Sequence, residues 1–137
     1  VDGCLYHYRN NAQSMTAAFD PHLTETIFIP LDILRTYFDT DKRALFAQYQ
    51  MYAAYLLQLW VRNQASLDCD LDRKGLRQSC ARVCQNQELR ALLASVPGAL
   101  PRQVAVAVRA VQQQKPGQLY LLIKAWNLYY KLRNGRA

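Results

Sequence analysis

Apolar residues recur at intervals of three or four along much of the chain, and the clearest run lies between residues 41 and 63. This spacing places side chains on one face of an α-helix. The main stripe of this run consists of Leu45, Tyr49, Tyr52, Leu56 and Leu59. Almost every position from Met51 to Val61 is apolar, so we expect this helix to be the central, most buried one.

The same spacing predicts four further helices, at residues 30–38, 73–84, 87–95 and 118–133. Proline, aspartate or asparagine stands near the start of several of them, where such residues favour helix initiation. Asp70 or Asp72 caps the helix at 73–84, and Asn86 caps the next one. Residues 101–114 contain the alternation "VAVAV", which suits a strand, but the length of the segment and its glutamines favour a helix.

The first thirty residues are the least regular part of the sequence. We interpret residues 1–30 as an N-terminal arm packed on the bundle, with a short helix near 12–19 and an extended stretch at 24–29. Residues 31–137 form the helical domain, and the length allows one domain overall. The predicted fold is therefore all-α, a single-domain irregular bundle of about five helices.

Charge is distributed unevenly along the chain, whose net charge is +7. Residues 1–88 hold all ten acidic residues, whereas residues 89–137 hold eight basic residues and no acidic one. This asymmetry indicates an anionic partner. We expect a protein partner with an acidic or apolar surface, with an anionic membrane surface as a further candidate and nucleic acid as a weaker one. The expected partner-binding residues are Arg102, Arg109, Lys115, Lys124, Trp126, Lys131, Arg133 and Arg136.

The four cysteines, Cys4, Cys69, Cys80 and Cys84, suggest a disulfide framework. Cys80 and Cys84 are four residues apart on a predicted helix, so each needs a partner elsewhere. We favour Cys69–Cys80 with Cys4–Cys84, and next Cys69–Cys84 with Cys4–Cys80. Such bridges would staple the arm to the bundle and indicate a periplasmic or secreted protein.

Two other interpretations of the cysteines stay open. A tetrahedral zinc site could combine Cys80 and Cys84 with Cys69 and either Cys4 or His7, although only one suitably spaced cysteine pair exists. Reduced cysteines buried in the core of a cytosolic protein are the plainer alternative. We favour an ordinary mature N-terminus over a lipid-modified Cys4.

No catalytic signature stands out. His7 and His22 fall in the arm and are expected to be solvated, and the aspartates at 68, 70 and 72 suit helix capping better than calcium binding. We therefore expect no enzyme and no cofactor. The leading hypothesis is a non-enzymatic exported helical adaptor or accessory subunit that binds a protein in a secretion or envelope assembly. The alternative is a cytosolic nucleic-acid-binding helical domain.

Overall fold

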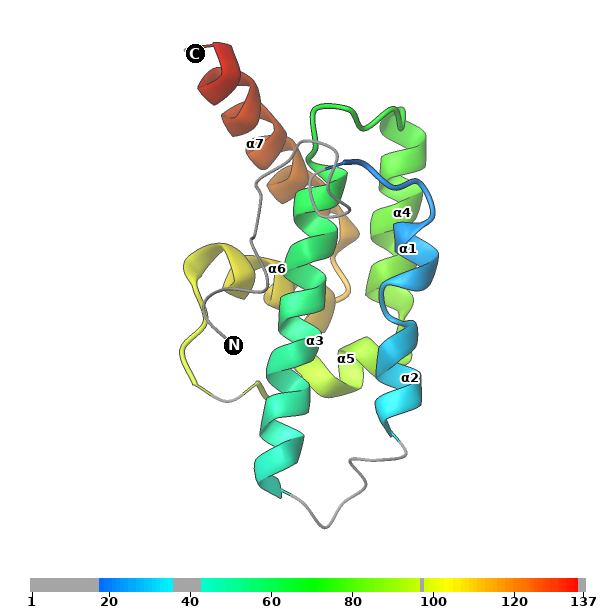
Figure 1. Ribbon diagram of the computed structural model, residues 1–137, viewed down its shortest axis with the longest axis vertical. Helices are drawn as coiled ribbons and strands as arrows, with labels where there is room; N and C mark the ends of the chain where they lie inside the picture. The colour runs from blue at the N-terminus through cyan, green and yellow to red at the C-terminus, as the bar shows by residue number, and fades with distance from the viewer. Residues whose placement is uncertain (1–17, 36–42, 97, 136–137) are drawn as a thin grey trace, which may run out of the picture.

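The structure, a computed structural model, describes residues 18–35, 43–96 and 98–135. Within these ranges all regular secondary structure is helical (Figure 1), which confirms the all-α prediction. The helices are α1 (Leu23–Thr26), α2 (Ile29–Arg35), α3 (Arg43–Gln64), α4 (Arg73–Gln85), α5 (Gln87–Leu93), α6 (Arg102–Gln112) and α7 (Pro116–Gly135). The "VAVAV" segment lies in α6, so the helical interpretation of that segment is confirmed.

Helix α3 occupies the centre of the bundle, as its nearly continuous apolar sequence predicts. It packs against α5, α6 and α7, while α4 packs against α7 and α6 (Figure 1). Ala53, Leu57 and Trp60 of α3 are completely buried. Burial of a large apolar side chain stabilises a fold by about 1.5–3 kcal/mol. The buried residues of α3 therefore contribute substantially to the stability of the bundle.

The N-terminal side of the described chain contributes to the same core. Ile27 and Phe28, which join α1 to α2, and Leu31 of α2 are all buried in it. The predicted division into an arm at 1–30 and a domain at 31–137 stays a prediction. The short helix expected near 12–19 lies mostly outside the described residues.

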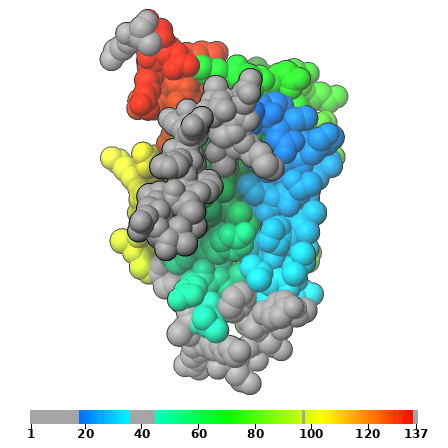
Figure 2. Space-filling model, viewed as in Figure 1, coloured from blue at the N-terminus to red at the C-terminus, as the bar shows by residue number. Residues whose placement is uncertain are grey.

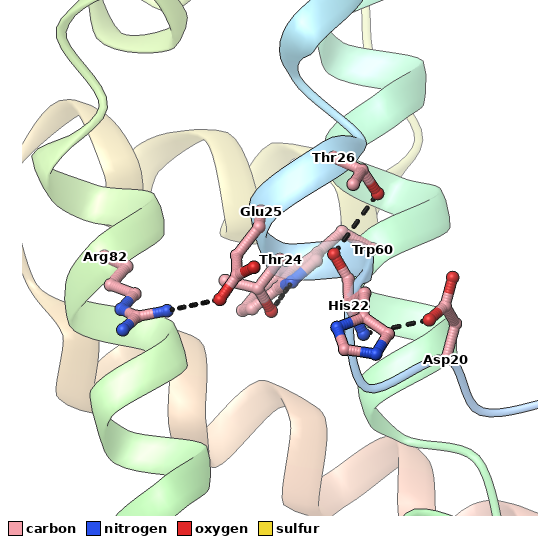
Figure 3. A network of polar contacts seen from close by, with 7 residues as sticks. All are labelled: Asp20, His22, Thr24, Glu25, Thr26, Trp60 and Arg82. Carbon is pink, nitrogen blue, oxygen red and sulfur yellow. Dashed lines mark hydrogen bonds and ion pairs between the residues drawn. The ribbon is translucent and has the colours of Figure 1, made fainter.

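Helix α1 replaces the extended segment predicted at 24–29, so that prediction is wrong. Two polar contacts hold α1 against its neighbours (Figure 3). The Trp60 indole Nε1 donates to the Thr24 hydroxyl at 2.9 Å, and Arg82 of α4 lies 3.2 Å from the Glu25 carboxylate. The Trp60 bond satisfies the indole N–H of a buried ring, whereas the exposed Arg82–Glu25 pair contributes little to stability.

Carboxamide side chains from other helices bind the carbonyl groups at the C-terminal end of α5. The last carbonyls of a helix lack intrahelical partners. The Gln50 Nε2 donates to the carbonyl oxygens of Leu92 and Ser95 at 3.2 and 2.8 Å, and the Gln112 Nε2 donates to that of Leu93. These bonds attach the short α5 to both α3 and α6.

The predicted N-caps of α4 and α5 are present. Asp72 Oδ1 accepts from the Gly75 N–H at 2.7 Å, and Asn86 Oδ1 accepts from the Leu89 N–H at 3.0 Å. Asn86 also follows the last residue of α4, so a single residue ends one helix and starts the next. An acceptor side chain at this position stabilises a helix by about 1 kcal/mol.

A tight turn joins α6 to α7, and Gln114 adopts a left-handed conformation in it, with φ of 51°. The Lys115 N–H donates to the Ala110 carbonyl at 2.8 Å, and the Gln114 N–H donates to that of Val111 at 3.1 Å. This pair of bonds is a Schellman motif, in which glycine usually occupies the left-handed position. The turn reverses the chain within a few residues and brings α7 back along α6.

We expect the Leu57→Ala variant to lose about 2–5 kcal/mol of unfolding free energy, because Leu57 is completely buried in α3. The matched control is Tyr55→Ala on the same helix, where the side chain is 53% exposed; its cost should stay near or below about 0.5 kcal/mol. Urea unfolding followed by far-UV circular dichroism measures both. Equal losses in the two variants would contradict the central position of α3.

We expect Gln114→Gly to stabilise the protein by up to about 1 kcal/mol. Relief of the left-handed backbone gains roughly 1–2 kcal/mol, and the extra entropy of glycine in the unfolded chain offsets part of it. Gln113→Gly is the control, because Gln113 has φ of −90° and gains no such relief. Thermal and urea unfolding should move in opposite directions for the two variants; a lower stability of Gln114→Gly would refute the assigned turn.

Candidate functional site

The disulfide prediction is wrong for the three cysteines that the structure describes. Cys69, Cys80 and Cys84 are all free. Cys80 and Cys84 point from α4 into the core, where both are buried, so their helical spacing serves packing. Cys4 lies outside the described residues. The prediction failed because a buried cysteine can pack in a large core as a small apolar residue, without forming a disulfide bond.

Burial suppresses ionisation of both core thiols. Removal from water raises the pKa of Cys80 to about 12 and that of Cys84 to about 11. The Cys84 thiol is also directed at the Ala110 carbonyl of α6, with 3.9 Å between sulfur and oxygen. Both groups are therefore protonated and unreactive at neutral pH. Among the described residues, no cluster of three or more histidines, cysteines or carboxylates is placed to hold a metal ion.

Because of these thiols, we expect the unfolding free energy to fall as the pH rises from 7.5 to 9.5. Unfolded thiols ionise near pH 8.5 whereas the folded ones keep their protons, so the contribution is complete below about pH 8.5 and lost towards pH 11–12. The loss should be about 2.5 kcal/mol for the two thiols together. Urea titrations at both pH values measure it. The Cys80→Ala/Cys84→Ala double variant should show a smaller fall, and an equal fall would remove the thiols as its cause.

The predicted partner-binding residues are divided between the two ends of α7. Lys115 precedes the first turn of this helix and Arg133 lies in its last turn, about 27 Å further along at 1.5 Å per residue. Arg102 and Arg109 are exposed on α6, and Lys124 and Lys131 are exposed on α7. Arg136 lies outside the described residues. The seven described residues therefore do not form one patch.

A groove of about 570 Å³ gathers part of the predicted set at the C-terminal half of α7. Trp126 and Arg133 line it together with residues from two other helices, Arg62 of α3 and Gln103 of α6. The remaining lining residues are Leu122, Ala125, Tyr129 and Tyr130 of α7. We call this the aromatic groove. It combines an apolar floor with two guanidinium groups, and none of its described lining residues is acidic.

Three aromatic rings of α7 pack on one another beside this groove. The Trp126 ring meets those of Tyr129 and Tyr130 edge-on, with centroids 6.4 and 5.6 Å apart. Such contacts fix the rings relative to one another. Trp126 and Tyr130 are half-buried, whereas Tyr129 is 53% exposed. The groove thus presents a preformed aromatic surface of the kind enriched in protein interfaces.

Asn127 determines how α7 leaves the bundle. Its Nδ2 donates to the Ala65 carbonyl at 3.0 Å and to that of Ser66 at 3.4 Å, at the end of α3. On the N-terminal half of α7, Tyr120 carries the Arg77 guanidinium 4.6 Å above its ring. Beyond Asn127 the helix continues for two more turns, which project at one end of the molecule (Figures 1 and 2). The exposed aromatic surface results from this projection.

A second hollow, of about 690 Å³, covers the start of α4. All of its lining residues come from α4 and its cap: Asp72, Arg73, Lys74, Arg77, Gln78 and Ala81. No described residue of another helix lines it. We therefore take the aromatic groove as the candidate site.

His22 is exposed, as predicted, and its backbone N–H donates to Asp20 Oδ1 at 2.9 Å (Figure 3).

Sequence reasoning identified Trp126 and Arg133 but missed four polar or aromatic residues of the groove: Arg62, Gln103, Tyr129 and Tyr130. The two tyrosines were noticeable in the stretch "AWNLYYKLR". Arg62 and Gln103 carry no local signal, because they reach the groove only through the packing of α3 and α6 against α7.

The fold and the groove define a small all-helical protein with a basic, aromatic surface at one end. No protein-family model, no curated protein and no solved structure matches the chain. None of the described helices has the length and hydropathy needed to cross a membrane.

Proposed function

We propose that this chain is a non-enzymatic helical adaptor or accessory protein that binds an acidic or apolar surface of a protein partner through the aromatic groove. The observation that carries the proposal is the composition of the groove: three mutually packed rings between Arg62 and Arg133. Aromatic residues and arginine contribute most of the binding energy in protein interfaces.

The charge around the groove supports an acidic partner. The ion pairs formed among the described residues are Arg35–Glu88 and Arg82–Glu25, and neither involves a groove residue. Arg62 and Arg133 are exposed and have no acidic neighbour of this kind to neutralise them. A partner carboxylate would therefore pair with a guanidinium that forms no ion pair with any other described residue.

Export was inferred from disulfide bonds, and the three described cysteines are free thiols. The proposed function therefore includes no cellular compartment. Binding to nucleic acid is the alternative, because arginines beside exposed rings also suit single-stranded RNA or DNA.

Chemical crosslinking of the purified chain in an extract of its source, followed by mass spectrometry, tests the proposal. We expect wild type to be crosslinked to one protein partner with at least about tenfold higher yield than Arg62→Glu/Arg133→Glu. Reversing these two charges makes the groove repel an acidic surface. The control is Arg73→Glu/Lys74→Glu, which makes the same change of charge in the hollow over α4.

Retention that is equal in all three proteins would reject the aromatic groove as the binding site. Retention that disappears after nuclease treatment, together with tight binding to RNA or DNA that weakens steeply with salt, would replace the proposal by the nucleic-acid alternative.

A further inference from the structure

The outward face of α7 carries an apolar stripe that no described part of the chain covers. Leu121, Leu128 and Leu132 are 65%, 57% and 55% exposed, and Ala125 between them is exposed as well. These four residues, the docking seam, follow one another at intervals of four, three and four. The inner face of the same helix buries Leu119, Tyr120 and Ile123 in the core. Helix α7 is therefore apolar on two faces, and only one of them is used within the described structure.

The spacing of the docking seam is that of a helix–helix contact. Apolar residues that alternate between steps of three and four form the seam of a coiled coil, where side chains of one helix fit between those of another. The seam extends for about 16 Å, or three turns, and the exposed Tyr129 lies beside it. A helix that lies in a lipid surface instead presents a broad apolar face with its large aromatic residues towards the lipid. Here Trp126 faces the aromatic groove.

Positive charge borders the seam directly on one side and lies across the aromatic groove, beyond Leu122 and Tyr129, on the other. Lys124 and Lys131 are seven residues apart, so they lie on one edge of α7. Arg133, with Arg62 of α3, lies on the edge that faces the aromatic groove. No acidic residue occurs anywhere in residues 89–137. In paired helices, the residues that flank the apolar seam select the partner by charge.

We infer that the docking seam binds an amphipathic helix of another protein, with an apolar stripe flanked by glutamate or aspartate. This inference rests on the proposed function and specifies the kind of partner surface. The leucines of the partner helix pack between Leu121, Leu128 and Leu132. Its acidic residues face Lys124 and Lys131 on one side and the arginines of the aromatic groove on the other.

Charge argues against a second copy of the chain as the occupant. Two antiparallel α7 helices would place Lys124 and Lys131 opposite the same lysines. Each copy would also bring the uncompensated positive charge of its C-terminal half into the contact. Like charges facing each other across a contact are destabilising.

A charge-exchange experiment with the full chain tests the inference. The probes are two fluorescent peptides of three heptads with leucine at the seam positions, one flanked by glutamates and the other by lysines. Fluorescence anisotropy at low salt should show that wild type binds the glutamate peptide at least about tenfold more tightly. Leu128→Glu should weaken this binding by at least about tenfold, because it places a carboxylate in the seam. Leu128 is exposed, so the variant is expected to fold, and circular dichroism checks this.

Lys124→Glu/Lys131→Glu should reverse the preference, so that this variant binds the lysine peptide more tightly. Its matched control is Arg109→Glu/Lys115→Glu, which changes the charge of the same half of the chain away from the seam and should leave the preference unchanged. A wild-type protein that does not distinguish the two peptides, or a variant whose preference does not reverse, overturns the inference. A dimer that Leu128→Glu dissociates, or leucine-dependent binding to vesicles with phosphatidylserine, overturns it as well by assigning the seam another occupant.

The protein partner found by crosslinking distinguishes a failure of this inference from a failure of the proposed function, because the two predict different variants to lose it. Loss of that partner in both Leu128→Glu and Arg62→Glu/Arg133→Glu supports both proposals. A partner that is lost only in Arg62→Glu/Arg133→Glu would leave protein binding by the aromatic groove intact and remove the docking seam. Absence of any protein partner would reject the proposed function, whatever the peptides do.

Discussion

Burial of α3 is the constraint on which the rest of the structure depends. Ala53, Leu57 and Trp60 are removed completely from water, and α5, α6 and α7 all pack against this helix. A helix that is apolar nearly all round cannot be covered by one partner, so several short helices are needed around it. The irregular arrangement of the bundle follows from this requirement, because each surrounding helix covers a different part of the α3 surface.

Carboxamide side chains add directionality to this hydrophobic packing. Gln50 and Gln112 bind the final carbonyls of α5, and Asn127 binds the carbonyls at the end of α3. Apolar contacts tolerate sliding, whereas a hydrogen bond between a carboxamide and one particular carbonyl sets both position and angle. Asn127 in particular determines where α7 stops covering the core. The exposure of Leu128, Tyr129 and Leu132, which belong to the two proposed binding surfaces, is a consequence of that position.

The core thiols show that the sequence and the structure lead to different interpretations of the same cysteines. Cys80 and Cys84 suggested bridges because the chain has an even number of cysteines, so that Cys69 and Cys4 could serve as their partners. In the structure both are buried, protonated thiols, and Cys84 lies against the Ala110 carbonyl of α6. Their helical spacing was interpreted correctly as placing both on one face, but the sequence does not reveal whether that face meets another cysteine or an apolar core.

Hydrophobic periodicity determined the helical class and the central position of α3, and the residue types before two helices determined the cap at Asn86 and limited the other cap to Asp70 or Asp72. These features depend on side chains near one another in sequence. The charge of the C-terminal half was also evident from composition. Tertiary structure alone decided that Arg62 and Gln103 join Trp126 in one groove and that Lys115 does not. These residues are far apart along the chain, and their meeting depends on the angles between packed helices, which weak and collective contacts among many side chains set together.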